Sequence, residues 1–385
     1  MKLDTCKIKD LCNFKYGKSL PERDRIEGVY PVYGSAGIVG THNEYLIKGP
    51  GIIIGRKGTV GSVMWSSKDF YPIDTAFYLE EDKSKIELKF LYYRLLISGL
   101  NTMNNDAAVP GLNRIAAHNH RIKIPRDINV QRIITNILSC YDDLIENNSK
   151  QISLLEESAK IIYREYILMY SQTKSNFQEI NLGALFSYEI GGGWGEENQS
   201  NGFSEPAYVI RGTDIYELPY GKTENVPFRF HKKSNLASRK LQDGDIIFEV
   251  SGGSQNEGVA KTLLVTTELL NQFNGDVMCA SFCKLARPVR RELSYFLFLF
   301  LQFLREIKGT EVFEIRSASN IVNYNWTAFL KFQKVKLPDD KTLEKFNEII
   351  DPIYKQIYNL GHQNQLLKEA RDILLPRLMT GIIKI

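Results

Sequence analysis

Acidic residues near position 80 have the types, but not the spacing, that a metal-dependent nuclease needs. Asp74, Glu81 and Lys83 loosely match the paired carboxylates and lysine that would hold Mg²⁺ beside a phosphodiester. The run Glu81-Asp82-Lys83 is tight and is of a kind common in charged loops. We therefore expect a solvated loop here, and a stand-alone nuclease is the alternative interpretation.

Two short segments end like the loop that cradles the phosphates of ATP. They are residues 17–19 (GKS) and 221–223 (GKT), but Cys12 and Tyr216 occupy the positions where that loop requires its first glycine. We interpret both segments as turns that carry a basic residue. The chain also has no Pro-Pro pair, so it lacks the Asn/Asp-Pro-Pro-Tyr/Phe motif of a methyltransferase. The sequence therefore predicts no catalytic residue.

The histidines and cysteines do not form a metal-binding pattern. His118 and His120 have no acidic or cysteine companion nearby, so we interpret them as phosphate contacts or surface residues. The five cysteines include no CxxC pair, and Cys279 and Cys283 fit two buried residues of an apolar strand. This usage predicts reduced thiols, a cytoplasmic location and no bound metal.

The most apolar run of the chain is too short to cross a membrane. Residues 293–304 (LSYFLFLFLQFL) number about a dozen, against the roughly 20 that a spanning helix needs. The N-terminal segment also lacks the long apolar core of a signal peptide. We therefore expect no membrane association and a helix at 293–304 that is buried inside a domain.

Basic side chains in the predicted loops are compatible with a nucleic-acid partner. The net charge of +4 permits DNA binding without requiring it, and each cation alone would also fit a solvated surface charge. Arg56 and Lys57 lie between glycines, where the backbone can approach DNA closely. The predicted DNA-binding residues are Lys18, Arg56, Lys57, Arg114, Arg211, Lys222, Lys232, Lys233 and Arg316.

An internal repeat supplies the elements that must position these loops. Residues 122–125 (IKIP) match 335–338 (VKLP) at a shift of 213 residues, and the sequence downstream aligns at that shift without gaps. Each copy predicts a helix of about 40 residues, on the order of 60 Å long. The aspartates that follow the two prolines and signal the helix starts are Asp127 and Asp340.

Apolar residues along both predicted helices follow the heptad pattern of a coiled coil. In the second copy they are Phe346, Ile350, Ile353, Ile357, Leu360, Leu367, Leu374 and Leu378. In the first copy they are Ile133, Ile137, Cys140, Leu144, Leu154 and Ile161, with polar interruptions at Asn147, Gln151 and Ser158. One such stripe usually marks an ordinary core-facing helix, whereas two matched stripes predict that the helices pair with each other.

A segment rich in glycine and β-forming residues precedes each predicted helix. Short apolar runs are separated there by glycine clusters, which is typical of curled antiparallel strands. The predicted domains are a first globular body at 1–125, a central helix at 126–170, a second body at 171–338 and a distal helix at 339–385. The fold class is α+β, with two β-rich domains separated by an antiparallel pair of long coiled-coil helices.

This order resembles the specificity subunit of type I restriction-modification enzymes across essentially the whole chain. The motifs that carry the resemblance are residues 30–35 (YPVYGS), 51–61 (GIIIGRKGTVG), 191–195 (GGGWG), 208–214 (YVIRGTD), 243–247 (DGDII) and 371–381 (RDILLPRLMTG). The two globular segments differ clearly in sequence. In this family such a difference implies two target-recognition domains for two different DNA half-sites. The helix starts at 129–132 (NVQR) and 343–345 (LEK) depart from the usual family pattern.

The resemblance implies a non-catalytic protein that directs enzymes to DNA. It would bind an asymmetric, bipartite target in double-stranded DNA and recruit two methyltransferase subunits and motor-nuclease restriction subunits. S-adenosylmethionine, ATP and Mg²⁺ would belong to those partners, which leaves this chain without a cofactor. The alternatives from other classes are the stand-alone nuclease and a coiled-coil scaffold that does not bind DNA.

Overall fold

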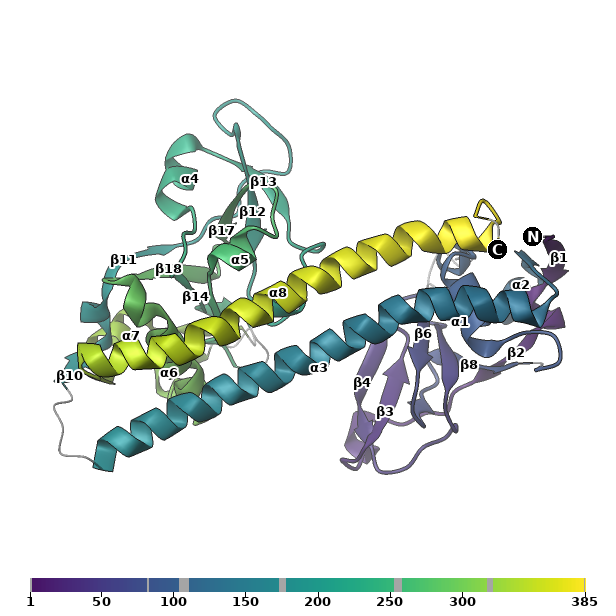
Figure 1. Ribbon diagram of the computed structural model, residues 1–385, viewed down its shortest axis with the longest axis horizontal. Coiled ribbons are helices and arrows are strands. Elements are labelled where there is room, and N and C mark those ends of the chain that lie inside the picture. Colours follow the sequence, from purple (N-terminus) through teal and green to yellow (C-terminus); the bar gives the residue numbers. More distant parts are fainter. Residues whose placement is uncertain are drawn as a thin grey trace. The chain divides into compact units, whose positions relative to one another are not determined.

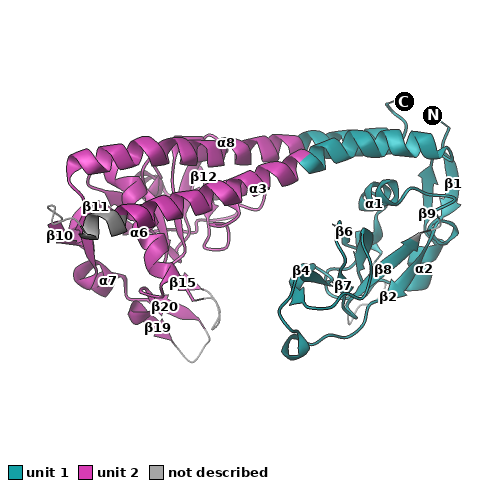
Figure 2. Ribbon diagram, turned by 60° about the horizontal axis from the view of Figure 1, so that its bottom comes forward, with its two compact units in different colours: residues 1–143, 368–385 teal, residues 144–367 magenta. Residues whose placement is uncertain are grey.

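The computed structural model describes residues 2–81, 83–103, 111–172, 178–252, 258–316, 321–383 and 385. The chain folds as two compact units (Figure 2): unit 1 comprises residues 1–143 and 368–385, and unit 2 comprises residues 144–367. Each unit contains one β-rich body and a segment of both long helices, α3 (Ile128–Gln172) and α8 (Asp340–Met379). Among the described residues, no helix is both long and apolar enough to span a bilayer.

Unit 1 is built on small sheets whose strands pair mostly antiparallel. Besides the long helices, its strands and α-helices are β1 (Asp4–Lys7), β2 (Cys12–Tyr16), β3 (Tyr30–Gly34), β4 (Gly37–His42), β5 (Gly51–Gly55), β6 (Val63–Ser66), β7 (Tyr71–Pro72), β8 (Ala76–Glu81), α1 (Leu88–Leu96), α2 (Arg114–Asn119) and β9 (Arg121–Ile124). One sheet has the order β2-β8-β5-β6 and another the order β4-β3-β7, while β1 pairs with β9.

The core of unit 1 lies where its four-stranded sheet packs against α1 and α3. The central strand β5 is buried along its whole length, because apolar side chains cover both of its faces. Ile52 and Ile54 point into the main core, and Ile53 points into a smaller cluster on the other face. Ile134 and Leu138 of α3 share the main core with the last turns of α8.

Unit 2 repeats this plan with different sheets. Its strands and shorter α-helices are β10 (Gln178–Asn181), β11 (Phe186–Gly191), β12 (Glu205–Ile210), β13 (Phe228–His231), α4 (Lys233–Arg239), β14 (Ile246–Glu249), β15 (Ser251–Gly252), β16 (Thr262–Leu264), α5 (Thr267–Leu270), β17 (Asp276–Cys279), β18 (Cys283–Pro288), α6 (Ser294–Glu306), β19 (Glu314–Arg316), β20 (Val322–Tyr324), α7 (Trp326–Phe332) and β21 (Lys334–Leu337). Its sheet orders are β11-β18-β14-β16, β13-β12-β17 and β15-β20-β19, and β10 pairs with β21.

Helix α6 forms the centre of the core in unit 2. Its first eight residues, 294–301, are all buried, because the helix is covered by strands and by both long helices. Its ring neighbours include Tyr163 of α3 and Phe346 of α8, which both contact Phe296. The structure therefore confirms the buried helix that the apolar run at 293–304 predicts.

The internal repeat appears as the same strand pair and helix start in each unit. Strands β9 and β21 lie 213 residues apart, as the sequence alignment predicts, and each pairs with the first strand of its unit. At the helix starts the shift falls to 212, because Asp127 and Asp339 cap the two helices. Each carboxylate accepts a hydrogen bond of 2.8 Å from a backbone N–H of the first turn. The alignment without gaps is wrong by one residue: Arg126 has no counterpart, and Asp339, not Asp340, is the cap.

This one-residue difference moves the heptad seam of α3. The seam predicted for α8 is confirmed, and at a shift of 212 its buried Phe346 and Ile350 correspond to Ile134 and Leu138, which are also fully buried. The seam predicted for α3 is wrong, because Ile133, Leu144, Leu154 and Ile161 are between 44% and 69% exposed. Of the residues one position later, Asn148, Ile152 and Ala159 are buried, and Ile145, Leu155 and Ile162 are half-buried. The true seam of α3 is thus more apolar than the predicted one.

The long helices pair antiparallel within each unit (Figure 1). In unit 1, Nη1 of Arg371 donates to Oδ1 of Asp142 at 2.6 Å. In unit 2, Nδ2 of Asn364 donates to Oγ of Ser149 at 3.4 Å, and the ring of Phe346 contacts α3 still further along its length. Later residues of α3 therefore meet earlier residues of α8, which is the antiparallel order that the matched heptads predict.

Candidate nucleic-acid interface

Two arginines from distant segments of unit 1 meet over one tyrosine. Tyr16 is the last residue of β2 and is 47% exposed. The guanidinium carbons of Arg56 and Arg114 lie 4.8 and 5.1 Å from the centre of its ring. Cation–π attraction holds a guanidinium in this position while its N–H edges can still donate to phosphates or bases.

The turn between β7 and β8 anchors the backbone of three predicted cations. The backbone N–H of Lys18 donates to the carbonyl of Pro72 at 3.1 Å. The backbone N–H groups of Arg56 and Lys57 both donate to the carbonyl of Thr75, at 2.9 and 3.2 Å. The structure thus brings together all the cations that the sequence predicts for unit 1. We call Tyr16, Lys18, Arg56, Lys57 and Arg114 the Tyr16 cluster.

Glycines beside the Tyr16 cluster allow this close approach of the backbone. A Cβ on Gly17 would lie 2.2 Å from the carbonyl oxygen of Ile73, and a Cβ on Gly55 would lie 2.1 Å from that of Thr59. Gly58 has a φ of +82°, which a side chain would strain. The glycines around Arg56 and Lys57 therefore bring the chain close to its own turns.

No carboxylate neutralises the Tyr16 cluster within the part of the chain that the structure describes. None of its four cations has an ion pair there, and Nη1 of Arg56 donates to the backbone carbonyl of Asp74 at 3.0 Å. Lys18 and Lys57 are exposed. Several unpaired positive charges on one surface create a field that attracts a polyanion such as DNA.

His118 and His120 support the chain beside the Tyr16 cluster. Nε2 of His118 accepts the backbone N–H of Phe14 at 3.0 Å, and Nε2 of His120 lies 2.8 Å from the carbonyl oxygen of Ser98. Burial, and then the charge of Arg114, lower the pKa of His118. Nε2 of His118 thus accepts from the backbone and Nε2 of His120 donates to it, so one nitrogen of each ring has a structural role.

Three of the predicted cations in unit 2 are paired with carboxylates. The pairs are Arg211 with Asp214, Lys222 with Glu217 and Arg316 with Glu314. Arg211 donates to both oxygens of Asp214, at 2.9 and 2.7 Å, and this hydrogen bonding raises its pKa. Asp214 is buried, so this pair fixes the turn after β12. The unit 2 cations therefore do not form a counterpart of the Tyr16 cluster.

Lys232 and Lys233 lie at the start of α4, beside an aromatic surface that the sequence reasoning missed. Nζ of Lys232 is 5.2 Å from the ring centre of Phe203. The guanidinium carbon of Arg229 is 4.9 Å from the ring centre of Trp194, in the loop between β11 and β12. A tryptophan enclosed by glycines, in the GGGWG motif, was the available sequence signal.

The carboxylates of the nuclease alternative do not converge. Asp74 precedes β8 and Glu81 is its last residue, so roughly 20 Å of extended chain separates them. One Mg²⁺ ion needs its ligand oxygens about 2.1 Å away. Asp82 and the side chain of Glu81 lie outside the described residues. Among the residues that are described, no group of three or more His, Cys, Asp or Glu side chains is placed to hold a metal ion.

The family model and the relatives that match this chain are specificity domains or subunits of type I restriction enzymes. Residues 2–157 match the family model of the type I restriction modification DNA specificity domain. The chain is 23% identical over 331 residues to the specificity subunit of the type I restriction enzyme MjaIX from Methanocaldococcus jannaschii, an alignment that covers 79% of this chain and 71% of that one. The chain is therefore similar to the type I restriction-modification specificity subunits along most of its length. A putative type I specificity subunit of Mycoplasma pneumoniae is 24% identical over 174 residues, 44% of this chain and 47% of the relative.

The fold of the chain has a solved counterpart. The crystal structure of the type I restriction-modification S subunit from M. genitalium superposes with a TM-score of 0.57 at 18% identity, covering 98% of this chain and 96% of that one. The predicted α+β fold class is therefore confirmed. Specificity subunits are the DNA-recognition components of type I systems and are not their catalytic subunits.

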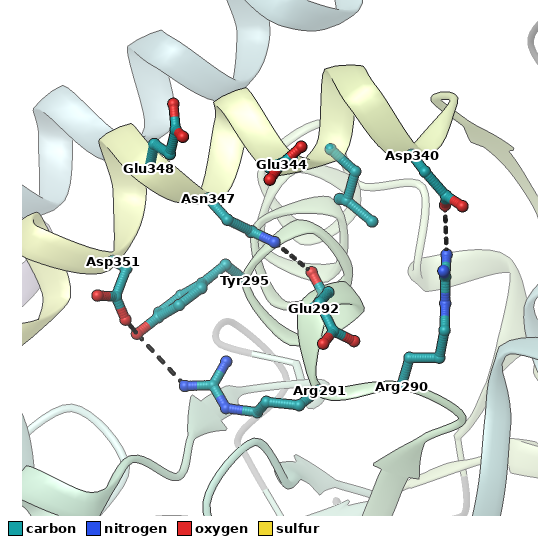
Figure 3. A pocket seen from close by; sticks show the side chains of 10 residues that line it. Arg290, Arg291, Glu292, Tyr295, Asp340, Glu344, Asn347, Glu348 and Asp351 are labelled. Atoms are coloured by element: carbon teal, nitrogen blue, oxygen red, sulfur yellow. Dashed lines mark hydrogen bonds and ion pairs between the residues drawn. The ribbon is translucent and has the colours of Figure 1, made fainter.

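A polar hollow of about 750 Å³ lies in unit 2, where α6 starts beside α8 (Figure 3). Its polar side chains bond to one another: Arg290 donates to Asp340 at 2.7 Å, and the hydroxyl of Tyr295 donates to Asp351 at 2.7 Å. The hydrogen bond and charge of Arg290 lower the pKa of Asp340. These contacts join α6 and the residues just before it to α8, so the hollow is a structural junction and not a cationic groove.

Cys279 and Cys283 are buried residues of two adjacent strands, β17 and β18, and not of the single strand that their spacing predicts. The strands belong to different sheets, and the backbone N–H of Cys283 donates to the carbonyl of Ala280 at 2.8 Å in the turn between them. Burial raises the pKa of Cys279 to about 12 and raises that of Cys283 well above its usual value. Both thiols are therefore protonated near neutral pH and poor nucleophiles.

Proposed function

We propose that this specificity subunit binds an asymmetric, bipartite target in double-stranded DNA, and that each unit reads one half of it. The Tyr16 cluster carries the proposal, because two of its arginines lie over an exposed ring and its two lysines are exposed in the same segments of the chain. Arginine can donate two hydrogen bonds to the O6 and N7 atoms of guanine, whereas lysine mainly contacts phosphate. Arg56 and Arg114 are therefore our base-reading candidates, and Lys18 and Lys57 our phosphate contacts.

The asymmetry of the proposed target follows from the difference between the units. Two copies of one binding surface would read the same half-site twice. The two units share the strand pair and the cap that start each long helix, but their other sheets differ in strand order. Their cations also differ, since those of the Tyr16 cluster lack carboxylate partners among the described residues while Arg211, Lys222 and Arg316 are paired. Two unlike surfaces fit two unlike half-sites.

Exposed apolar pairs on the long helices support the recruitment of two copies of one partner. Leu154 and Ile161 of α3 are exposed, and so are Leu366 and Ile373 of α8, which follow them by 212 residues. A spacing of seven places both members of each pair on one helix face. Exposed apolar patches of this kind mark protein interfaces. We assign these two equivalent sites to two methyltransferase subunits.

The proposed complex also contains the motor-nuclease restriction subunits and acts on cytoplasmic DNA. S-adenosylmethionine, ATP and Mg²⁺ bind to the partner subunits in this proposal. The specificity subunit contributes recognition and assembly. We therefore expect the purified chain alone neither to methylate nor to cut DNA.

Replacement of one recognition surface tests the proposal. Residues 10–115 are exchanged for the corresponding segment of a relative, and the chimaera is produced together with the methyltransferase subunit of this system. Methylated sites are then mapped by sequencing. We expect one half of the target to change while the other half stays the same. The wild-type subunit in the same host is the control, and a change of both halves or of neither would contradict the proposal.

A further inference from the structure

We infer that the loop between β11 and β12 in unit 2, residues 192–204, reads base edges through the side-chain amides of Asn198, Gln199 and Asn201. This inference rests on the proposed function and deepens it. It assigns base-reading side chains to unit 2, the unit in which most of the predicted cations are ion-paired. The ligand is one half-site of duplex DNA, and the chemistry of the loop selects A·T base pairs within it.

The loop is anchored where it leaves β11. The backbone N–H of Gly192 donates to the carbonyl of Cys283, and that of Gly193 to the carbonyl of Cys279, both at 2.9 Å. Nε of Arg239 donates to the carbonyl of Gly191 at 2.8 Å. These bonds fix the backbone immediately before Trp194, a large side chain that nevertheless remains 41% exposed.

The next anchor joins the loop to β13. Gly195 has a φ of +72°, and a Cβ there would lie 2.6 Å from Cε1 of the buried His231. Glu196 and Phe230 exchange two backbone hydrogen bonds of 2.9 Å. The guanidinium of Arg229 lies between its partner carboxylate on Glu197, at 2.7 Å, and the ring of Trp194. A side chain would therefore disrupt the loop at Gly195.

A tight turn closes the other end of the loop. Ser200 and Phe203 exchange backbone hydrogen bonds of 3.3 and 3.0 Å, and Gly202 between them has a φ of +85°. The ring of Phe203 lies beside the ammonium of Lys232. Each end of the loop is thus held by a cation against an aromatic ring, which limits the motion of the residues between them.

Three amide side chains project from this anchored loop. Asn198, Gln199 and Asn201 are exposed, and their side chains form no hydrogen bond within the described part of the chain. Isolated surface amides are commonly only solvated. These three differ because they share one anchored loop, where little conformational entropy remains to be lost on binding.

The chemistry of these amides fits adenine in the major groove. A carboxamide has a donor and an acceptor side by side, which match the N7 and the N6 amino group of adenine. The neighbouring cations Lys232 and Lys233 are exposed and fit adjacent phosphates. The carboxylates of the loop already have partners, since Glu197 pairs with Arg229 and Glu196 accepts from the hydroxyl of Ser200. The loop therefore combines base-reading groups with positive charge at its base.

Methylation mapping of the complete complex tests the inference. The triple variant Asn198→Ala, Gln199→Ala, Asn201→Ala is produced with the methyltransferase subunit, and discrimination is measured at every base pair of the wild-type target. Asn201 does not adopt a positive φ, so alanine fits its backbone. We expect discrimination to fall about 10- to 100-fold at one or two A·T pairs. Those pairs must lie in the half that the exchange of residues 10–115 leaves unchanged.

A matched control removes three exposed amides from elsewhere in unit 2, at Gln178, Asn271 and Asn274. We expect this control to methylate the wild-type target without loss of discrimination. Gln199→Glu gives a second readout that does not depend on the triple variant folding. Glutamate only accepts hydrogen bonds, so the preferred base at the affected position should move from adenine toward cytosine.

Three results would overturn the inference while leaving the proposed function intact. The first is an unchanged target and affinity for both the triple variant and Gln199→Glu. The second is a uniform loss of DNA affinity without any change of specificity, which would make the loop a phosphate contact. The third is loss of methyltransferase binding with normal DNA binding, which would make the loop a protein interface. A wild-type complex that lacks a bipartite target would instead overturn the proposed function.

Discussion

The two units of the molecule share a frame and differ in the surface that it carries. In unit 1 the pair β1–β9 and the cap Asp127 lead into α3, and in unit 2 the pair β10–β21 and the cap Asp339 lead into α8. On this frame, unit 1 presents the Tyr16 cluster. Unit 2 presents ion-paired cations and a loop with exposed amides.

This difference between the units shows which structural features the repeated sequence encodes. The repeated residues are those that pair strands, cap helices and fill the helix seam, and these tasks are the same in both units. The unrepeated residues surround the candidate ligand sites. We infer that unit 1 gains affinity mainly from charge, whereas unit 2 depends more on hydrogen bonds from fixed amides.

Removal of the arginines of the Tyr16 cluster should have the largest effect on DNA binding. We expect Arg56→Ala with Arg114→Ala to lower the affinity about 30-fold or more, because each guanidinium contact contributes roughly 1–3 kcal/mol. The matched control is Lys222→Ala with Arg316→Ala, whose cations are already paired with carboxylates. Fluorescence anisotropy with a labelled target duplex measures both variants in complex with the methyltransferase subunit. Equal losses from the two variants would remove the difference between the units.

Longer helices should change the spacing between the half-sites without changing the half-sites. Seven residues are inserted after Leu144 in α3 and after Leu367 in α8, because a heptad keeps the seam in phase. The pairs Asp142–Arg371 and Ser149–Asn364 bracket these positions on the two helices. We expect a spacer about three base pairs longer, since seven helical residues add about 10 Å. Methylation mapping measures the spacer, and a single insertion in α3 should abolish activity. An active double-insertion variant that keeps the original spacer would contradict this prediction.

Replacing a polar side chain between the long helices should lower the free energy of unfolding in unit 1 and raise it in unit 2. In unit 1, Asp142 accepts hydrogen bonds from Arg371 and from Tyr93, so Asp142→Asn should lower the free energy of unfolding by about 2 kcal/mol. In unit 2, Oδ1 of the buried Asn364 has no hydrogen-bond partner in the described structure. We expect Asn364→Leu to raise the free energy of unfolding by about 1 kcal/mol. Urea denaturation measures the free energy of unfolding of both variants. A change of the same sign in both would contradict the predicted difference between the units.

Acidification should have the smallest effect, through the half-buried His118 in unit 1 and the buried His231 in unit 2. Burial lowers the pKa of His118 in unit 1, with Arg114 adding to the shift, and burial lowers that of His231 in unit 2, with Arg239 adding to it. The unfolded chain takes up a proton near pH 6.5 more readily than the folded chain. Stability from the neutral rings is therefore complete above about pH 6.5 and falls toward pH 5.

His118→Gln tests the pH dependence, because glutamine can still accept the backbone N–H of Phe14. We expect this variant to lose part of the decrease in urea midpoint between pH 7.5 and 5.5, and to keep the part that His231 causes. Surface variants that leave both histidines in place are the control. An unaltered pH dependence in His118→Gln would show that this ring does not titrate on unfolding.

The sequence predicted the long helices, the buried α6 and the family, but it misplaced the seam of α3. The error came from one residue, Arg126, in the segment between a strand and a helix cap. Hydrogen bonds to Asp127 and Asp339 decide where the helices start, and an alignment without gaps cannot detect them. One residue turns a helix by about 100°, so this small error moved the predicted seam of α3 by that angle, away from the buried face.

The prediction of the candidate DNA-binding site from the sequence was limited in a similar way. Sequence alone named Arg56, Lys57 and Arg114 as separate candidates, but only the fold placed two of these arginines over Tyr16. The sequence does contain a short-range pattern that indicates ion pairing of a unit 2 cation, and the prediction did not use it. Asp214 lies three residues after Arg211, and such short spacings favour an ion pair.

The amino-acid sequence by itself determined the periodic features of this protein, because heptads, strand runs and glycine turns depend on neighbours within a few residues. It also determined the repeat, the absence of known catalytic motifs and the resemblance to specificity subunits. Only the tertiary structure decided which charges remain unpaired and which side chains meet. Residues 16, 56 and 114 come together through the pairing of strands far apart in the chain, and that pairing depends on the whole core of unit 1.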